Sequence, residues 1–342
     1  MDKINIIIIF IVIIIIYLIL RSYYNDSNYY NEYYGKIDAV YTWVNGTDPK
    51  WVAKRDSYSD KPKNEDAASA IRFENINELK YSLRSLFKYA PWINNIYIVT
   101  DDQIPTWLNT KHPKIHIIDH KDIFPDKDIL PVFNSQAIEC CLHKIPNLTE
   151  FFMYFNDDMF LGNTLNKQDI ISSDGKPFYY GKQWTCNYKG PPKENEIGYV
   201  SAWKNNNSIM RNEFLNRIVS CPWHQSILCS KSVLNMLEEK YAIQFAVTMR
   251  SKFRDITNIA PIGLSVIYAV EIGKSINNTI MPNVYIGANK VNRSQMKGLL
   301  QKITTQKPKF FCINNITPDL PTVDLIHSFF DDYFSNKCDY EL

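Results

Sequence analysis

The sequence has no surplus of charge of either sign. Its 38 Lys and Arg residues nearly balance its 36 Asp and Glu residues, and the net charge is only +2. Proteins that bind nucleic acid carry clustered Lys and Arg residues that neutralise the phosphate backbone, and such clusters make the domain basic. We therefore expect no nucleic-acid partner.

The cysteines lack the spacing of a metal or redox motif. The chain has 7 cysteines, and no two of them form a CxxC pair. This excludes a zinc knuckle and a thioredoxin-type site. Because 7 is an odd number, at least one thiol is unpaired within the chain. The sequence also lacks an internal repeat.

Apolar residues, by contrast, are plentiful. Hydrophobic residues make up 45% and aromatic residues 14% of the 342 residues. This composition supplies enough apolar surface for one large core or two modest ones, and it differs from the polar composition of disordered chains. We expect a folded globular body.

A hydrophobic run without any charge covers residues 4–20 and is followed by Arg21. At a rise of about 1.5 Å per residue, a helix of this length crosses most of the hydrocarbon core of a bilayer. A cleaved signal peptide is the alternative, but its apolar region is usually shorter and ends in small residues. Because Arg21, Ser22 and Tyr23 follow the run, we interpret residues 1–21 as a single-pass transmembrane anchor.

A polar stem of residues 22–35, rich in Tyr, Asn, Asp and Ser, separates the anchor from the body. Lys3 and Arg21 give almost no charge asymmetry across the anchor, so the sequence leaves its orientation open. Glycosylation sequons at Asn147 and Asn292 are compatible with a lumenal body. We expect a membrane protein whose body lies on the lumenal or extracytoplasmic side.

The body, residues 36–342, alternates apolar strands with amphipathic helices. This alternation implies crossover connections and a mainly parallel sheet with helices on both faces. We predict a Rossmann-like α/β fold that binds a nucleotide-sugar at the carboxyl ends of its strands. The pattern predicts strands at 37–44, 95–100, 115–118, 151–155 and 178–184, helices at 76–89, 134–143 and 232–241, and an apolar segment at 259–272.

Two adjacent carboxylates, Asp157 and Asp158, directly follow the apolar strand 151–155. Their position predicts a carboxylate pair at the edge of a buried sheet. Enzymes that break the diphosphate of an activated sugar commonly neutralise it with Mg²⁺ or Mn²⁺ held by one or two carboxylates. A turn with capping aspartates before Gly162 is the other interpretation. The pattern alone leaves both open.

The first predicted strand ends in a loop with the sequence Asn45, Gly46, Thr47, Asp48 and Pro49. This run is typical of a turn whose aspartate caps a helix that begins at the proline. The functional alternative is a backbone cradle for a nucleotide or a phosphate. The pattern alone favours the turn.

His224 and Arg254 are candidate catalytic residues of the second half. His224 follows Pro222 and Trp223 and is a candidate general acid or base, although an isolated histidine is more often structural. Arg254 follows Lys252 closely. This basic pair indicates either a solvated basic face or a clamp on phosphate.

Charged residues also flank or occupy the predicted helix 76–89, namely Arg72, Glu78 and Arg84. Their spacing is adequately explained by ion pairs on a surface. None of them requires a function by itself.

Long stretches of the body nevertheless follow a known pattern almost letter for letter. The first covers residues 37–49, and further stretches cover 78–86, 90–92, 96–101, 103–109, 133–139 and 154–158. Together they resemble the first two blocks of the Stealth family, which includes bacterial capsule hexose-1-phosphate transferases and the catalytic subunit of the N-acetylglucosamine-1-phosphotransferase. Stretches of this length do not recur by chance.

The third and fourth blocks of the family are less similar to this chain. Ser226 stands two residues after His224, where the family usually has proline, and Arg254 resembles the arginine of the third block. The fourth block ends at Asn315, where the family typically has an acid. The middle of the chain, about residues 163–220, diverges from the family.

The resemblance implies transfer of an N-acetylhexosamine- or hexose-1-phosphate from a UDP-sugar to a hydroxyl of a glycan or glycoprotein acceptor, with release of UMP. It implies that Asp157 and Asp158 hold Mg²⁺ or Mn²⁺. It also implies that His224 deprotonates the acceptor and that Arg254 stabilises the transferred phosphoryl group. The donor-binding residues that it implies are Asp38, Thr42, Trp43, Asn45, Gly46, Asp48, Arg72, Arg84, Asn134 and Ser135.

Two other functions stay open at this point. An ordinary metal-dependent glycosyltransferase uses the same donor and cation but breaks the sugar C1–O bond and releases UDP. A non-catalytic, membrane-tethered sugar-binding relative is the second, because Ser226 and Asn315 depart from the family pattern. The released nucleotide distinguishes the two enzymes from each other.

Overall fold

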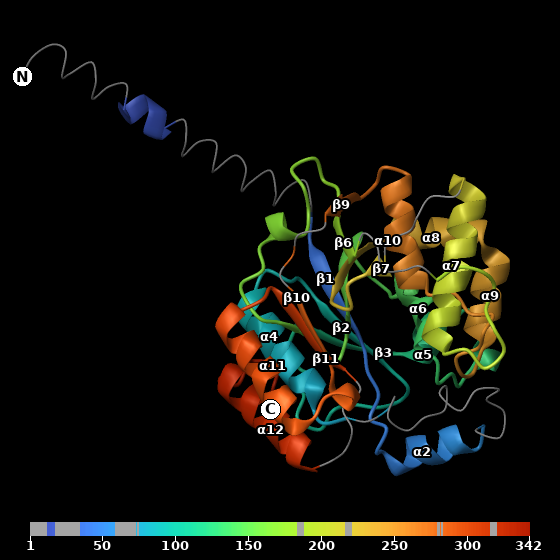
Figure 1. Cartoon of the computed structure of the whole chain (residues 1–342), viewed down its shortest axis with the longest axis horizontal. Helices are drawn as coiled ribbons and strands as arrows, with labels where there is room; N and C mark the ends of the chain where they lie inside the picture. The colour runs from blue at the N-terminus through green and yellow to red at the C-terminus, as the bar shows by residue number, and fades with distance from the viewer. Residues whose placement is uncertain are drawn as a thin grey trace, which may run out of the picture.

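The computed structural model describes residues 12–17, 35–58, 73, 75–182, 188–215, 221–278, 281, 283–314 and 320–342. A five-stranded sheet with the order β3-β2-β1-β4-β8 lies at the centre of the body (Figure 1). Its strands are β1 Ile37–Thr42, β2 Ile96–Thr100, β3 Ile115–Asp119, β4 Phe151–Asn156 and β8 Ile227–Ser230.

The central sheet is mainly parallel, as predicted. β1 pairs in parallel with β2 and β4, β2 pairs in parallel with β3, and β8 runs antiparallel to β4. Strands that are covered on both faces carry apolar residues at nearly every position. β1 and β2 follow this rule, since they are buried along almost their whole length. The predicted α/β fold is confirmed.

Helices cover both faces of this sheet. On one face, Tyr41 of β1 packs in a core with Leu83 of α4 (Glu78–Tyr89). On the other face, Val40 of β1 belongs to a core with Leu234 and Leu264. One strand serves both cores because successive side chains point to opposite faces. The helices of the second face are α6 Ser135–Glu139, α7 Gly198–Phe214, α8 Lys231–Lys240, α9 Ala242–Arg250 and α10 Pro261–Glu271.

A second, three-stranded sheet with the order β10-β11-β5 carries its own helices. Its elements are β5 Met159–Leu161, β10 Asn283–Gly287, β11 Phe310–Asn314, α11 Arg293–Gln306 and α12 Leu320–Tyr333. Phe160 and Phe311 stack with ring centroids 4.9 Å apart, and Phe330 of α12 and Phe334, just after this helix, pack against them. This aromatic core holds the C-terminal helices beside α4 (Figure 1).

Shorter elements connect these layers. A third sheet places β6 Phe178–Lys182 between β7 Cys221–Pro222 and β9 Ile276–Asn278. The short helices are α2 Pro49–Asp56 and α5 His120–Ile123, together with the 3-10 turns Lys127–Ile129, Leu142–Lys144, Lys167–Asp169 and Ala288–Lys290.

The helix predicted at 134–143 is shorter than expected. α6 ends at Glu139, and a separate 3-10 turn follows at Leu142–Lys144. The reason is a tightened turn, since the Cys141 N–H bonds to the Ile138 carbonyl instead of continuing the α-helical pattern. The helices predicted at 76–89 and 232–241 and the apolar segment at 259–272 correspond to α4, α8 and α10.

The predicted anchor, residues 1–21, and the stem, residues 22–35, fall largely outside the described residues. Of the anchor, only residues 12–17 are described, and they form a short exposed helix. Among the helices that the structure describes, none is both long and apolar enough to cross a membrane.

The strand order predicts the position of the ligand-binding crevice. In a sheet with β1 between β2 and β4, the connections on either side of β1 run over opposite faces, and a crevice opens at the carboxyl ends of β1 and β4. α4 and α6 do lie on opposite faces, in separate cores. Thr42 ends β1 and Asn156 ends β4, paired in register. The predicted site residues at both strand ends therefore flank one crevice.

Candidate active site

Asp157 and Asp158 form the turn between β4 and β5. β4 belongs to the central sheet, whereas β5 pairs with β11 of the second sheet. The N–H of Ile313 on β11 donates to the Asp158 carbonyl at 3.3 Å. The two aspartates consequently lie where the two sheets meet, at the carboxyl end of β4.

The Asp158 carboxylate binds two side chains of β11 through one oxygen. The Asn314 amide donates to Oδ2 at 2.7 Å, and the Cys312 thiol lies 3.4 Å from the same atom. The other oxygen, Oδ1, is buried and has no hydrogen-bond partner among the described residues. A buried acceptor without a donor costs free energy until a ligand satisfies it. This oxygen is therefore available to a ligand.

His224 lies next to this carboxylate. The Asn314 amide that bonds to Asp158 also donates to His224 Nε2 at 3.1 Å, so Nε2 is the acceptor nitrogen of the ring. Burial lowers the pKa of His224, the charge of Asp158 opposes this effect, and Arg254 adds to it. The imidazole is consequently neutral at neutral pH, and its single acceptor lone pair, on Nε2, is engaged by the Asn314 N–H. It can act as a general base only when an acceptor hydroxyl replaces that amide at Nε2.

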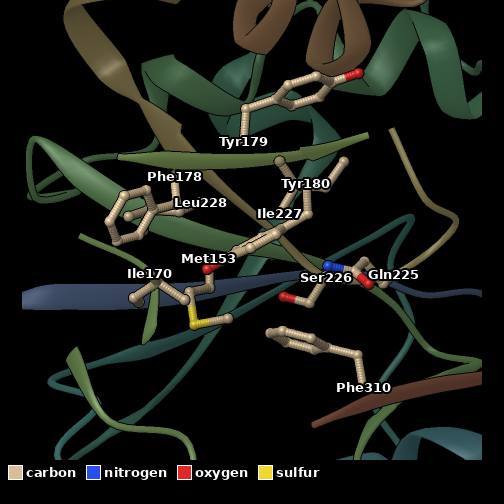
Figure 2. Close-up of a pocket in the computed structure, with 10 residues that line it drawn as sticks. All are labelled: Met153, Ile170, Phe178, Tyr179, Tyr180, Gln225, Ser226, Ile227, Leu228 and Phe310. Atoms are coloured by element: carbon tan, nitrogen blue, oxygen red, sulfur yellow. The ribbon is translucent and has the colours of Figure 1, made fainter. Parts of the chain in front are cut away.

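The loop that carries His224 is tied to β10 and to a small cavity. Gln225 accepts a hydrogen bond from the Asn283 amide of β10. Gln225 and Ser226 line the cavity together with Met153 of β4 and Phe310 of β11 (Figure 2). The Ser226 hydroxyl, at the position where proline was expected from the family, is buried and has no partner among the described residues. The hydrogen bond from Asn283 to Gln225 holds this loop, which has Ser226 in place of the expected proline.

Asp157 lies in an acidic environment. Desolvation raises its pKa most, and the nearby carboxyls of Glu78 and Asp158 raise it further. Neither a lysine nor an arginine is among the main causes of the raised pKa of Asp157 and Asp158. Carboxylates concentrated in this way are the arrangement that a cation relieves.

A divalent cation fits these residues by the chemistry of their donors. Mg²⁺ and Mn²⁺ prefer oxygen ligands, and Asp157 and Asp158 supply them, including the unsatisfied Oδ1. Asp158, His224 and Cys312 also place oxygen, nitrogen and sulfur atoms within 4.8 Å of one another. The sulfur is a poor ligand for these two ions. The carboxylate pair is therefore the better candidate for the predicted cation.

A second polar cluster lies across the crevice, on the side of α6. The Tyr154 hydroxyl is 2.7 Å from Asn156 Oδ1 and 3.3 Å from Glu139 Oε1, and Thr42 bonds to the same asparagine oxygen at 3.3 Å. Burial raises the pKa of Glu139 to about 7, against the opposing charge of Arg254. Glu139 is therefore a carboxyl beside the site whose protonation changes near neutral pH.

Arg254 reaches the crevice from the loop after α9. Its Nη2 donates to the Ser135 hydroxyl of α6 at 2.8 Å. The buried Asn134 amide holds the same loop, since it bonds to Asn258 at 2.8 Å and to the carbonyls of Ser251 and Phe253. Asn134 thus fixes the backbone that presents Arg254.

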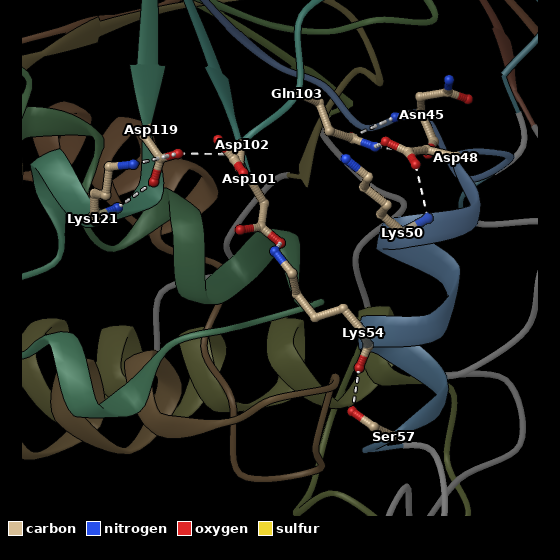
Figure 3. Close-up of polar contacts among 10 residues, drawn as sticks. All are labelled: Asn45, Asp48, Lys50, Lys54, Ser57, Asp101, Asp102, Gln103, Asp119 and Lys121. Carbon is tan, nitrogen blue, oxygen red and sulfur yellow. Dashed lines mark hydrogen bonds and ion pairs between the residues drawn. The ribbon is translucent and has the colours of Figure 1, made fainter.

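The loop after β1 is rigid and polar (Figure 3). Asp48 caps α2 by accepting from the Lys50 N–H at 2.9 Å, which confirms the predicted turn and cap. The Gln103 amide bridges the loop, since it donates to Asp48 and to the Asn45 carbonyl at 3.1 Å each. A Cβ at Gly46 would lie 1.9 Å from the Phe73 carbonyl oxygen, so only glycine fits there.

Models of two conserved regions match the chain. Stealth protein CR1, conserved region 1, covers residues 35–63, and Stealth protein CR2, conserved region 2, covers residues 72–179. A capsular polysaccharide phosphotransferase of Haemophilus influenzae is 36% identical over 82% of this chain and 78% of its own length. An exopolysaccharide phosphotransferase of Lactiplantibacillus plantarum is 33% identical over 82% of this chain and 87% of its own length.

The chain belongs to the Stealth family. Other relatives are longer: an exopolysaccharide phosphotransferase of Streptomyces coelicolor is 36% identical over 89% of this chain but only 51% of its own length. The chain spans between a third and three-fifths of four such Streptomyces relatives. Among solved structures, the galactosyltransferase LgtC in complex with donor and acceptor sugar analogues matches with a TM-score of 0.41 and 7% identity over 86% of this chain and 96% of that chain.

Most of the site residues expected from the Stealth pattern come together at the crevice. Asp157, Asp158 and His224 lie on one side, and Ser135 and Arg254 lie on the other. Thr42, Trp43, Asn45, Gly46 and Asp48 follow β1 at its carboxyl end. The Trp43 ring nitrogen is buried and lacks a partner among the described residues.

Asp38 and Arg84, expected at the donor, lie elsewhere. Asp38 is at the amino end of β1, where its carboxylate accepts from the Asn95 and Thr149 backbone N–H groups. Arg84 forms a two-pronged ion pair with Glu341 near the C-terminus, at 2.7 and 2.8 Å. The charged groups of both side chains are bonded to partners away from the strand ends that carry Asp157 and Thr42. Arg72 and Asn315 lie outside the described residues.

Sequence reasoning missed several polar residues of the site. Asn314 and Cys312 contact Asp158, and Glu139, Tyr154 and Asn156 form the second cluster. All five lie within stretches compared with the Stealth blocks, but their spacing does not show which face of a strand they occupy. Only the pairing of β11 with β5 brings Asn314 to the aspartates.

Proposed function

We propose that the protein transfers a sugar-1-phosphate from a UDP-sugar to a hydroxyl group of a glycan acceptor and releases UMP. The observation that carries this proposal is the group formed by a neutral His224, Asn314 and the Asp157–Asp158 pair at the topological crevice of the sheet. Support also comes from the Stealth relatives, which are named as polysaccharide phosphotransferases.

In the proposed reaction the acceptor oxygen attacks the phosphorus atom that bears the sugar. The acceptor hydroxyl replaces the Asn314 amide at His224 Nε2, and Nε2 then takes the hydroxyl proton as the new P–O bond forms. The bond between that phosphorus and the bridging oxygen breaks, and UMP leaves with the electron pair. Arg254 provides a fixed positive charge for the oxygens of the phosphoryl group during transfer.

The nucleotide is proposed to lie along the loop after β1. This loop is held in one conformation by Gln103 and by the Asp48 cap, so it presents the backbone of residues 42–48 without loss of order on binding. The buried Trp43 nitrogen is a free donor at this edge. A Mg²⁺ or Mn²⁺ ion at Asp157 and Asp158 would neutralise the charge of the diphosphate.

The test is to incubate the purified chain with UDP-sugars, Mg²⁺ and candidate glycans and to separate the nucleotides by anion exchange. We expect UMP, and we expect His224→Ala to lower the rate by about 10²- to 10⁴-fold, the usual loss for a general base. His112→Ala is the matched control, because the His112 ring packs on Tyr340 and accepts from the Lys114 N–H, away from this group. UDP as the product would show an ordinary glycosyltransferase instead.

We also propose that residues 1–21 hold the body at a membrane, on its lumenal or extracytoplasmic side. The support is the charge-free hydrophobic run of residues 4–20. The full chain should sediment with membranes and resist carbonate extraction, whereas a variant without residues 1–21 should not. Release of the full chain by carbonate would contradict the proposal.

A further inference from the structure

An exposed aromatic ring stands directly beside His224. Tyr285 is the central residue of β10, where Val284 and Ile286 point into the core against α11. Because side chains alternate along a strand, Tyr285 points to the opposite side. Its ring meets the His224 imidazole at a right angle with centroids 5.5 Å apart, and 48% of the residue remains exposed. A large ring is therefore left open to solvent at the base.

A second exposed ring stands beside Arg254. Gly198 begins α7, and a Cβ at this position would lie 2.8 Å from the Arg254 Cβ. The first turn of α7 thus packs closely against Arg254, and the next residue, Tyr199, is 39% exposed. Its ring is held edge-on by Tyr188 and Trp203, each at 6.3 Å. Tyr199 is therefore held by ring contacts and remains partly exposed.

The two tyrosines flank the two candidate catalytic side chains of the second half. The Tyr285 ring contacts the His224 imidazole. Tyr199 follows Gly198, which packs against Arg254. Both tyrosines are partly exposed, and Ile197, just before α7, is 53% exposed. Single exposed apolar residues need no explanation, but such a group around two candidate catalytic side chains does.

The chemistry of this surface fits a sugar ring. A tyrosine offers an apolar ring face and a polar hydroxyl, and a pyranose offers an apolar face of C–H groups with hydroxyls at its rim. Binding sites for small ligands combine such aromatic walls with a few polar groups. Both tyrosines lie outside the two matched regions, residues 35–63 and 72–179, which contain the loop proposed for the nucleotide. The surface therefore suits the acceptor rather than the nucleotide.

We infer that Tyr199 and Tyr285 form the acceptor subsite, which binds one pyranose ring of a glycan and places its hydroxyl at His224 Nε2. This inference rests on the proposed function for the direction of transfer, but sugar binding by the two rings can be measured without it. The subsite lies between α7 and β10, and it determines which acceptor the protein uses.

The experiment measures binding and turnover separately in the full chain. Saturation-transfer NMR is recorded with lactose, cellobiose and di-N-acetylchitobiose as probes, and UMP release from a UDP-sugar is recorded without acceptor. We expect at least one disaccharide to receive saturation from the wild-type protein. Tyr285→Ala and Tyr199→Ala should each weaken its binding about 10-fold, whereas Tyr285→Phe and Tyr199→Phe retain most of the binding because they keep the ring.

Controls separate this effect from misfolding and from loss of the donor site. Phe87→Ala removes a ring on α4 that is 36% exposed and packs on Tyr340, so it should leave sugar binding unchanged. The melting temperature is measured for every variant, and the two Tyr→Phe variants, which keep the ring contacts with His224, Tyr188 and Trp203, show whether a loss of binding follows from the missing ring or from misfolding.

The outcomes distinguish the two proposals. Absence of disaccharide binding to the wild-type protein, or binding that both Tyr→Ala variants retain, overturns the acceptor subsite even if UMP is released. Release of UDP together with ring-dependent sugar binding overturns the proposed transfer and leaves the sugar subsite standing. Loss of acceptor-free UMP release in both Tyr→Ala variants would place the rings at the donor and overturn the acceptor assignment.

Discussion

At the scale of single residues, the site depends on Asn314. Its amide donates one N–H to Asp158 Oδ2 and the other to His224 Nε2. The same side chain thereby orients the carboxylate and keeps Nε2 as the acceptor nitrogen of the imidazole. Asn314 therefore orients the proposed base, and its N–H leaves Nε2 when the acceptor hydroxyl binds there.

Replacing this amide should impair turnover more than folding. We predict that Asn314→Leu, which has a similar volume but no donor, lowers kcat by about 10- to 100-fold, the usual loss when a supporting hydrogen bond is removed. The measurement is the rate of UMP release at saturating donor. Asn163→Leu is the control, because Asn163 donates only to the Lys307 carbonyl at the surface. Equal rates for both variants would contradict the positioning role.

Glu139 should make stability depend on pH. Burial raises its pKa from 4.5 to about 7, so the folded protein binds this proton more tightly than the unfolded chain. The contribution of Glu139 to stability is then fully present below about pH 4.5 and is lost as pH rises through 7. Glu139→Gln cannot ionise and should be more stable than wild type above pH 7, on the order of 1–3 kcal/mol.

Urea unfolding at several pH values measures this effect. The difference in unfolding free energy between Glu139→Gln and wild type should shrink toward zero as the pH falls below 4.5. A difference that does not change with pH would show that the carboxyl is not the cause. Arg254 is the charged group that faces Glu139, and its charge opposes the rise in pKa.

Residue identity could be predicted from the sequence better than residue role. Asp157 and Asp158 stand out because they follow an apolar strand. His224 stands out because it follows Pro222 and Trp223 in a predicted loop. Asp38 and Arg84 lie in equally well-matched stretches, but the fold gives them backbone and C-terminal partners. Those partners are distant in sequence, so spacing could not identify them.

At the scale of elements, the loop after β1 depends on close backbone packing. A side chain at Gly46 would collide with the Phe73 carbonyl. We predict that Gly46→Ala destabilises the protein by about 1–3 kcal/mol, the range for overpacking, and weakens binding of the donor nucleotide. Gly298→Ala in α11 is the control, because its Cβ meets nothing within 4 Å and alanine favours a helix.

The two glycine variants are compared by thermal unfolding and by titration with UDP. Gly298→Ala should be as stable as wild type or more stable by about 0.5–1 kcal/mol. An unchanged melting temperature and unchanged UDP affinity for Gly46→Ala would contradict the packing argument.

Strands could be predicted from sequence, whereas some helices could not. β1, β2 and β4 are uninterrupted apolar runs, as buried parallel strands must be. α7 was missed because its buried face includes Asn206, Asn207 and Lys204, which bond to backbone carbonyls and to Glu196. Polar residues in a buried helix face obscure the apolar period that sequence analysis relies on.

At the scale of the whole molecule, the C-terminal residues are tied to α4. Glu341 accepts a two-pronged hydrogen bond from Arg84 and lies 3.6 Å from Lys80. Burial alone would raise the pKa of Glu341, but the bonds from Arg84 and the Cys338 N–H lower it to about 2. Its contribution to stability is present above pH 4.5 and is lost as pH falls toward 2.

Glu341→Gln should therefore destabilise the protein at neutral pH by about 1–3 kcal/mol. The loss relative to wild type should diminish as the pH approaches 2. Arg250→Gln breaks an exposed pair with Asp126 and serves as the control, with an expected cost below about 1 kcal/mol. Urea unfolding at neutral and acid pH measures both variants, and equal costs for the two would contradict the role of the C-terminal tie.

The position of the phosphate after the reaction tests the central claim most directly. The donor is a UDP-sugar with radioactive phosphorus at the β-position, next to the sugar, and the products are separated after reaction with a glycan acceptor and Mg²⁺. Transfer of the sugar together with its phosphate predicts that the label is recovered in the glycan and that the released UMP is unlabelled. Label in released UDP, with none in the glycan, would contradict the account.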